Sequence, residues 1–314
     1  MIIQDIIKEI EEFAPLNYAE DFDNVGLLVG DKTAVVTGAL ITLDTLETTV
    51  DEAISKNCNL IVSFHPIIFS GLKKITGKNY VERVVLKAIK NDIAIYAIHT
   101  ALDNQYKGVN DMICEKIGLI NREILIPKKN SIKKLLTFVP ADDAEKVRKA
   151  IFDAGGGSIG NYDNCSFNVN GTGSFKGNTS SNPVIGERGS LHFEKETQIG
   201  ITFPAHLEGN ILNALFTSHP YEEVAYEITS LENSNQHLGM GMIGELEKPQ
   251  EEKAFLKTIK STFKTGCLRH SELLEKPIKK VAVLGGSGAF CDRKCEKSRS
   301  RCVHHSRFKI SRLL

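Results

Sequence analysis

The sequence has little of what marks a membrane, secreted or nucleic-acid-binding protein. No apolar run approaches the roughly 20 residues that a membrane-spanning helix needs. The first residues place acids between isoleucines and lack the basic n-region of a signal peptide. No stripe of interleaved basic and aromatic residues indicates a nucleic-acid surface. We therefore expect a cytoplasmic protein without a membrane partner, and we do not expect a nucleic-acid partner.

What is present is the composition of an ordinary globular protein, with 314 residues of which 41% are hydrophobic and 25% are charged. A chain of this length can bury a large core and is expected to hold two domains. Residues 1–13 carry isoleucines at helical spacing, which predicts an amphipathic helix. Four cysteines are isolated in the sequence, and in a reducing compartment we predict that they are free, buried thiols; they are Cys58, Cys114, Cys165 and Cys267.

The net charge of zero averages two unlike segments. Residues 291–314 hold eight Lys or Arg against two Asp or Glu, a charge of +6, so the other 290 residues carry 31 against 37, or −6. No apolar periodicity continues into this tail. It can be interpreted as a basic arm for nucleic acid or as a zinc site built from Cys291, Cys295, Cys302 and neighbouring histidines. We favour a third interpretation, an out-of-frame or otherwise foreign C-terminus.

The first 125 residues or so alternate strands with helices. This alternation predicts parallel neighbouring strands in an α/β sheet that is covered on both faces. A glycine at position 118 is expected to end the last helix. The expected strands are 35–43, 60–63 and 93–98, and the expected helices are 46–56, 80–91 and 109–117.

The pattern changes near residues 127–131 and changes back near residue 239, with a further strand expected at 280–284. The order of the elements between these points is typical of a ferredoxin-like (PII/CutA-like) α+β domain. The expected elements are strands at 133–139, 167–169, 189–193, 197–203 and 224–229 and helices at 144–154 and 206–217. We therefore predict an α/β domain formed by 1–127 and 237–290, an inserted α+β domain at 128–236, and an aberrant basic tail at 291–314.

Polar side chains follow two of the apolar runs in the α/β part. His65 follows the run at 61–63, and His99 and Asp103 follow the run at 93–98. Ligands of open α/β sheets bind beyond the carboxyl ends of the strands, so these residues are site candidates. Imidazole and carboxylate together suit Zn, Fe, Mn or Ni.

The chain resembles the Nif3-like family, whose bacterial members are often labelled GTP cyclohydrolase 1 type 2 homologs. The resemblance covers about residues 1–290 and depends on seven segments in a fixed order. These segments are EDFDNVGL at 20–27, SFHPIIFSGLK at 63–73, IHTALDN at 98–104, GTGSF at 171–175, SNPVIG at 181–186, HPYEEVAY at 219–226 and VLGGSG at 283–288.

This resemblance implies a Nif3-like α/β domain with the inserted domain, two divalent metal ions per subunit and a homohexamer. It implies that His65 and Asp103 are metal ligands, and that His99 is either a ligand or a group that orients water. Two departures are visible. Family members commonly carry His-His before the proline, where this chain has Phe64, and they close with a Gly-His-x-x-Ser-Glu type segment that gives the metals a His and a bridging Glu. This chain contains neither that C-terminal His nor that Glu. A single-nucleotide shift after Phe290 would produce such a loss.

Other motifs have a structural and a functional interpretation. Asp23 and Asn24 line the site or cap a turn, and we favour the turn. The segment 219–223 (HPYEE) suits acid/base chemistry or a loop contact, and we favour the loop. The turn at 285–288 (GGSG) lacks the remainder of a P-loop, so packing is the favoured role. A lysine cluster (Lys73, Lys74, Lys78) can meet a phosphate or remain solvated.

We therefore expect a dinuclear-metal protein that hydrolyses a nucleotide or other phosphorylated small molecule, without being able to assign catalytic residues. The alternative is a non-enzymatic hexameric scaffold or regulator in which the metals are structural.

Overall fold

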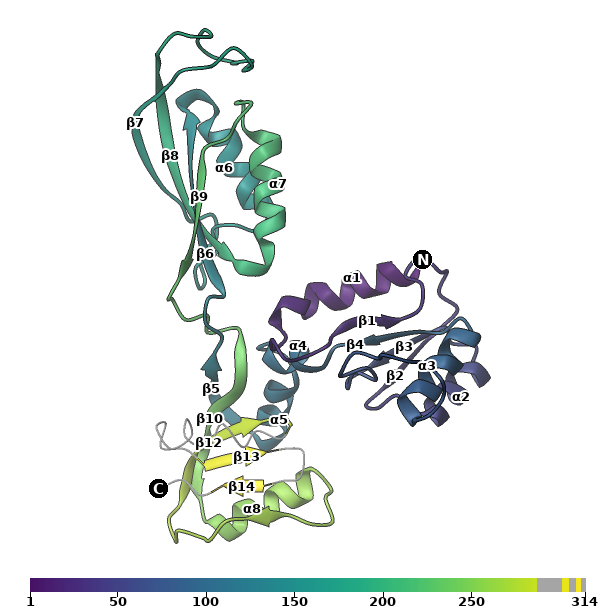
Figure 1. Ribbon diagram of the computed structural model, residues 1–314. Coiled ribbons are helices and arrows are strands. Elements are labelled where there is room, and N and C mark those ends of the chain that lie inside the picture. Colours follow the sequence, from purple (N-terminus) through teal and green to yellow (C-terminus); the bar gives the residue numbers. More distant parts are fainter. Residues whose placement is uncertain (287–300, 305–308, 312–314) are drawn as a thin grey trace. The chain divides into compact units, whose positions relative to one another are not determined.

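The computed structural model describes residues 1–286 in full and the backbone of 301–304 and 309–311 (Figure 1). The chain divides into two compact units. The first unit is Met1–Pro127 with Gln236–Leu314, and the second is Lys128–Asn235. The second unit is therefore inserted in the sequence of the first.

The first unit contains a four-stranded sheet in the order β1-β4-β3-β2. Strands β2 (Ala39–Thr42), β3 (Leu60–Ser63) and β4 (Ala94–Ala97) run parallel, and β1 (Gly26–Val29) is antiparallel to β4. The helical crossovers between the parallel strands produce this arrangement, as the sequence predicted. The carboxyl ends of three neighbouring strands consequently meet at one edge of the sheet.

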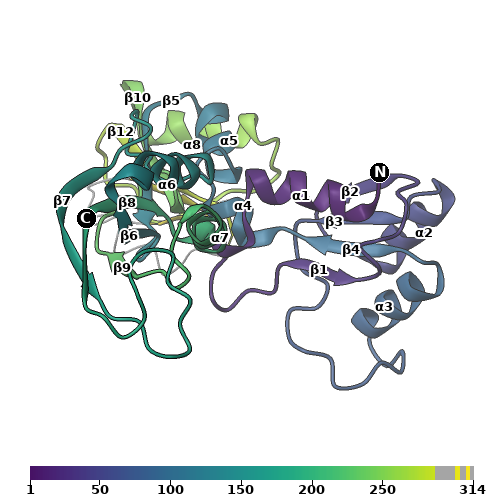
Figure 2. The same ribbon diagram turned by 90° about the horizontal axis from the view of Figure 1, so that it is seen from above.

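Helices cover both faces of this sheet, because alternate residues of each strand point to opposite sides. Leu60 contributes to a core with helix α1 (Ile3–Phe13), while Ile61 contributes to a core with α2 (Glu47–Ser55) and α3 (Tyr80–Lys90). Figure 2 shows α1 and α3 on opposite sides of the strands. The amphipathic helix that the N-terminal isoleucines predicted is α1, which buries Ile3 and Ile7.

The first unit also contains a six-stranded sheet, in the order β11-β14-β13-β12-β10-β5. The sequence predicted one of its strands, at 280–284, but not the sheet. Helices α5 (Val109–Ile117) and α8 (Glu252–Thr262) supply a shared core with it. The short helix α4 (His99–Asn104) lies between β4 and α5 in the chain. The strands are β5 (Leu119–Pro127), β10 (Gly239–Gln250), β11 (Arg269–His270), β12 (Ile278–Leu284), β13 (Arg301–His304) and β14 (Lys309–Ser311).

The inserted unit has the βαββαβ order and the antiparallel sheet order β7-β8-β6-β9, which is the expected ferredoxin-like arrangement. Its two long helices pack together and share a core with the sheet (Figure 1). Its elements are β6 (Ile132–Pro140), α6 (Ala144–Asp153), β7 (Phe167–Phe175), β8 (His192–Pro204), α7 (Glu208–Ser218) and β9 (Tyr226–Leu231).

Two expectations need correction. Of the four thiols predicted to be buried, Cys114 is buried, Cys58 and Cys165 are partly exposed and Cys267 is exposed; all four are free. The strands predicted at 189–193 and 197–203 are one strand, β8. The basic tail, in which the sequence shows no apolar periodicity, contains β13 and β14, which pair within the sheet. The side chains of the proposed zinc site in this tail lie outside the described residues. Among the described residues, no helix is both long and apolar enough to cross a membrane.

Candidate metal centre

Two histidines meet where the parallel strands β3 and β4 end. Ser63 and Ala97, the last residues of these strands, are register partners, and each histidine follows its strand by two residues. The His99 N–H donates to the Phe64 carbonyl over 2.9 Å, which continues the strand pairing beyond the sheet. The imidazole centroids of His65 and His99 are therefore 5.4 Å apart, with an interplanar angle of 75°. The sequence placed both residues at this edge.

Phe64 takes part in this arrangement as an aromatic neighbour. Its ring makes edge contacts with both imidazoles, at centroid distances of 5.0 Å to His65 and 5.6 Å to His99. An aromatic ring can pack against imidazoles but cannot bind a cation through a lone pair. Where the resemblance leads us to expect a histidine, Phe64 therefore supports the two rings by packing.

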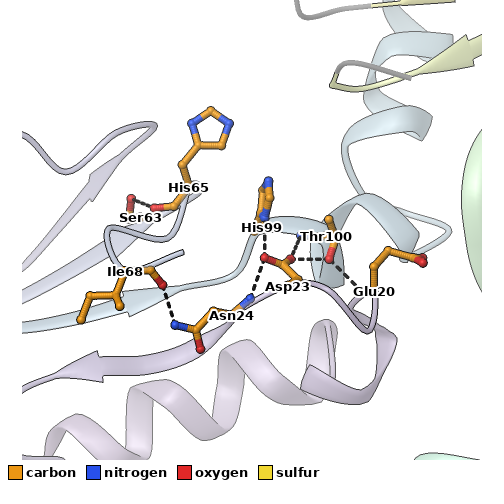
Figure 3. Close-up of polar contacts among 8 residues, drawn as sticks. All are labelled: Glu20, Asp23, Asn24, Ser63, His65, Ile68, His99 and Thr100. Atoms are coloured by element: carbon orange, nitrogen blue, oxygen red, sulfur yellow. Dashed lines mark hydrogen bonds and ion pairs between the residues drawn. The ribbon is translucent and has the colours of Figure 1, made fainter. Parts of the chain in front are cut away.

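The carboxylate of Asp23 lies beneath His99 and holds it in place (Figure 3). Asp23 Oδ1 is 2.8 Å from His99 Nδ1, and the Asp23 side chain is 0% exposed. The backbone N–H of Thr100 donates to Asp23 Oδ2 over 3.1 Å, and the Thr100 hydroxyl donates to the same oxygen. Burial raises the pKa of Asp23, but the hydrogen bonds from His99 and Thr100 together lower it by more. The resulting pKa is about 2. Asp23 is therefore an ionised support for His99 as well as a turn residue.

His99 also has an unusual backbone conformation. Its φ angle is +29°, in the left-handed region that side chains other than glycine rarely adopt. Such strain persists where surrounding contacts fix it, and it is concentrated at functional sites. Here the contacts with Phe64 and Asp23 fix the residue.

A second carboxylate contacts the other histidine. Asp44 follows β2, the strand beside β3, and its Oδ1 is 2.7 Å from His65 Nδ1. Both side chains are about half exposed, at 54% for Asp44 and 45% for His65. Our reading of the sequence missed Asp44, although its place directly after a parallel strand is the same signal that identified the histidines.

Asp103 occupies the same helical face as His99, because the two residues are four positions apart in α4. Burial raises the pKa of its carboxyl to about 6. Its Oδ1 atom is buried and has no hydrogen-bond partner among the described residues. The glycine turn after β12 approaches it, since a Cβ added at Gly285 would lie 3.3 Å from Asp103 Oδ1. The close approach suits the packing role expected for this turn.

Asn110 ties the glycine turn to the segment that carries Asp103. Its side-chain amide donates to the Asp103 carbonyl over 2.9 Å and accepts from the Gly285 N–H over 2.7 Å. Asn110 is 1% exposed, so both bonds lie in the interior. The end of β12 and the end of α4 are therefore fixed relative to each other at Asp103.

The donor types at this edge fit a divalent cation, although they do not surround one. A buried carboxylate oxygen without a partner and two adjacent imidazoles are suitable ligands. Within residues 1–286, however, no three His, Cys, Asp or Glu side chains are placed around one ion position. His65, His99 and Asp103 are thus donors of the expected types that do not form a complete coordination shell among the described residues. The exposed lysines at 73, 74 and 78 lie on the loop that follows His65.

The HPYEE segment belongs to the inserted unit and its histidine has a structural role. The Tyr221 N–H donates to His219 Nδ1 over 3.1 Å, so the ring carries its proton on Nε2, which contacts the Phe138 carbonyl at 3.0 Å. Burial lowers the pKa of His219. Both ring nitrogens are used in local contacts, which favours the loop interpretation of this segment over acid/base chemistry.

Comparison with known proteins gives one consistent family. The model of Duf34/NIF3 (NGG1p interacting factor 3) matches residues 1–300. The chain is 38% identical over 307 residues to a GTP cyclohydrolase 1 type 2 homolog of Bacillus subtilis, covering 98% of this chain and 79% of the relative. It is 40% identical over 286 residues to the protein of that name from Halalkalibacterium halodurans, covering 91% and 77%.

Solved structures agree with these sequence matches. A Bacillus cereus protein related to NIF3 matches with a TM-score of 0.83 and 36% identity, covering 99% of this chain and 87% of that one. Staphylococcus aureus protein SA1388 matches with a TM-score of 0.73 and 27% identity, covering 98% and 81%. The agreement extends over both units and over the segments that form the edge described above. The chain therefore belongs to the Duf34/NIF3 family.

Proposed function

We propose that this chain binds divalent metal ions through His65 and Asp103, with His99 as a further ligand or a water-orienting group, and hydrolyses a nucleotide or another phosphorylated small molecule. The observation that carries the proposal is the buried Asp103 oxygen, which has no hydrogen-bond partner among the described residues and is close enough to His99 and His65 for their charges to offset part of the rise in pKa that burial causes. Leaving such an oxygen unsatisfied is costly, and a cation would satisfy it.

The two aspartates that contact the imidazoles support this assignment. A histidine that binds a metal usually donates its other N–H to a carboxylate, which fixes the ring and raises its basicity. Asp23 and Asp44 contact Nδ1 of His99 and His65, so Nε2 is the atom left for coordination in each ring. A bound divalent ion would supply Lewis acidity and a nucleophilic water near neutral pH.

The substrate class is supported by charge and by the names of relatives. Three exposed lysines (Lys73, Lys74, Lys78) lie on the loop between His65 and α3, where they can attract a phosphate. The curated relatives carry the name GTP cyclohydrolase 1 type 2 homolog, which refers to a nucleotide. The ligand set offered by residues 1–286 is incomplete, which leaves coordination positions for water and substrate.

Metal titration tests the proposal directly. Purified chain is stripped with chelator, and Zn²⁺, Mn²⁺ and Co²⁺ are titrated calorimetrically into the wild type, His65→Ala and Asp103→Asn. We expect both variants to weaken binding by about tenfold or more, while the control His270→Ala, at an exposed histidine elsewhere in the unit, binds as the wild type does. Hydrolysis of nucleoside triphosphates and of p-nitrophenyl phosphate should then require the metal. Equal affinity in all four proteins would reject the site.

We also propose that the chain forms homo-oligomers, with a hexamer as the family implies. Strand β7 is an edge strand, and Phe167 on it is 76% exposed, while Phe193 on the adjacent β8 is 64% exposed. Exposed edges with large apolar residues are usually covered by a partner. Light scattering after size-exclusion chromatography should give a smaller mass for Phe167→Glu/Phe193→Glu than for the wild type, and an unchanged mass would contradict this interface.

A further inference from the structure

The inserted unit contains a cavity of about 680 Å³ that is separate from the proposed metal site. Its floor is the part of the sheet formed by β7 and β8, and its walls are the loop after β7 and the HPYEE segment. The volume falls in the range of pockets that bind small organic molecules. The lining combines apolar side chains with a small number of polar groups.

The central polar group is the carboxylate of Glu196 on β8. The Tyr221 hydroxyl donates to its Oε1 atom over 2.9 Å. The carboxylate lies over the backbone of Gly173, where an added Cβ would be 2.1 Å from Glu196 Oε2. A side chain at this position of the GTGSF segment would therefore displace the Glu196 carboxylate from its observed place.

Aromatic side chains stand beside this carboxylate. Phe175 and Tyr221 make an edge-to-face contact with centroids 5.6 Å apart, and Phe138 also lines the cavity. Burial first, and the hydrogen bond to Glu196 second, raise the pKa of Tyr221, so its hydroxyl remains a neutral donor. The apolar residues Val184 and Ile185 of the loop complete the wall.

The loop that forms the outer wall is attached to the HPYEE segment. The Asn182 N–H donates to Glu222 Oε2 over 2.7 Å, and Pro183 and Val184 follow directly in the cavity lining. This contact explains why SNPVIG and HPYEE, which are far apart in the sequence, belong to one site. The motifs that the metal centre does not use therefore converge on this cavity.

The charge of the lining determines which ligand fits. It contains three carboxylates, Glu196, Glu222 and Glu223, and one basic residue, Lys176. A phosphate or carboxylate ligand would be repelled, whereas a cation would be attracted. A carboxylate next to aromatic rings suits a planar cation, which can form two parallel hydrogen bonds with the carboxylate and contact the ring faces.

We propose that this cavity binds a small planar organic cation, an amidinium or guanidinium on an apolar body, with its head on Glu196 and its body against Phe175 and Tyr221. This assignment is independent of the proposed hydrolase. It gives the GTGSF, SNPVIG and HPYEE segments a common role in ligand binding.

Benzamidine is the probe that tests the proposal, because benzamide has the same shape without the charge and benzoate has the opposite charge. Each is titrated into the full chain and followed by calorimetry and by ligand-observed NMR. We expect benzamidine to bind with a Kd below about 1 mM, and benzamide and benzoate to bind at least about tenfold more weakly. Absence of benzamidine binding, or equal binding of benzamide, would overturn the proposal.

Two substitutions locate the binding. Glu196→Gln keeps the shape of the side chain and removes its charge, and we expect at least about a tenfold loss of benzamidine affinity. Gly173→Ala displaces the carboxylate and should give a comparable loss. Glu145→Gln, on α6 of the same unit and outside the cavity lining, is the matched control. Circular dichroism checks that each variant folds, and unchanged affinity in a folded Glu196→Gln would refute the assignment.

Discussion

The two histidine–aspartate pairs at the edge of the first sheet have almost the same hydrogen bond in different surroundings. His99 and Asp23 are 2.8 Å apart with exposures of 19% and 0%, whereas His65 and Asp44 are 2.7 Å apart with exposures of 45% and 54%. The buried carboxylate has additional donors in Thr100 and the backbone of Asn24. The exposed carboxylate contacts its histidine under solvent screening.

This difference indicates that equal distances do not imply equal contributions to stability. A buried charge whose hydrogen bonds are broken leaves several groups unsatisfied, while an exposed pair contributes 0–1 kcal/mol. We therefore infer that the inner pair, His99 and Asp23, stabilises the local fold and positions the His99 ring. The outer pair, His65 and Asp44, orients the His65 ring with little effect on stability. The following four predictions test this contrast, in order of decreasing effect.

Removing the inner carboxylate should have the largest effect. Asp23→Ala leaves His99 and both Thr100 donors without an acceptor, so we expect the free energy of unfolding to fall by about 3 kcal/mol. Asp44→Ala is the matched control and should change it by less than about 1 kcal/mol. Urea unfolding at pH 7 measures both values. Similar losses in the two variants would contradict the contrast.

The pH dependence of unfolding should show the contribution of the inner pair to stability without a large substitution. The pKa of Asp23 is lowered to about 2 from 3.8, so its contribution is present above pH 4 and is lost as the pH falls toward 2. This loss amounts to about 2 kcal/mol for a shift of this size. Unfolding measured from pH 5 to pH 2 should show a shallower decline for Asp23→Asn than for the wild type. Parallel declines would refute the assignment.

The ionisation of Asp103 should affect stability in the opposite direction to that of Asp23. Its pKa is raised to about 6, so between pH 4 and 6 the folded chain binds a proton that the unfolded chain has lost. Stability therefore falls as the pH rises through this window, and the cost is fully present above pH 6. In chelator at pH 7, we expect Asp103→Asn to stabilise the chain by about 1–2 kcal/mol, and this gain should disappear at pH 4. A destabilised variant at pH 7 would reject this sign.

The outer pair should affect metal affinity and leave stability unchanged. Removing a carboxylate that orients a metal-binding imidazole typically costs about 10- to 100-fold in affinity, and we expect the lower value for Asp44→Asn because the pair is exposed. Unfolding of the metal-free protein should change by less than about 0.5 kcal/mol. Calorimetric Zn²⁺ titration and urea unfolding on the same samples separate these effects. Unchanged affinity would remove Asp44 from the site.

The fold was predictable wherever local signals were strong. Helix α5 begins and ends at the predicted residues because Gly118, with φ of +78°, closes it in a left-handed conformation. Strand β5 was missed because charged residues interrupt its apolar pattern at Arg122–Glu123. Strand β8 was divided into two because Glu194–Glu196 belongs to its partly exposed half. These strands are stabilised by pairing with distant segments, which a local pattern does not contain.

The candidate site was predictable as far as strand ends reveal it. His65, His99 and Asp103 were identified because parallel strands bring their carboxyl ends together. The role of Asp23 was not identified, because its partner His99 is 76 residues away and the local sequence favours a turn. Asp44 was overlooked because a carboxylate just before a helix also suits a cap. The carboxylates that contact the histidines were therefore recognised only from the tertiary structure. The candidate ligands themselves were recognised from the sequence.

The pairing of β5 with β10 has an evolutionary consequence. The chain leaves the first unit after Pro127 and has returned by Gly239, and these two residues are register partners on adjacent antiparallel strands. The inserted unit thus occupies the position of a hairpin loop. Because the entropic cost of closing a loop grows slowly with its length, a whole domain can be gained or lost there with little penalty to the sheet. The architecture therefore allows the inserted unit to be acquired or discarded while the sheet edge that carries His65 and His99 is preserved.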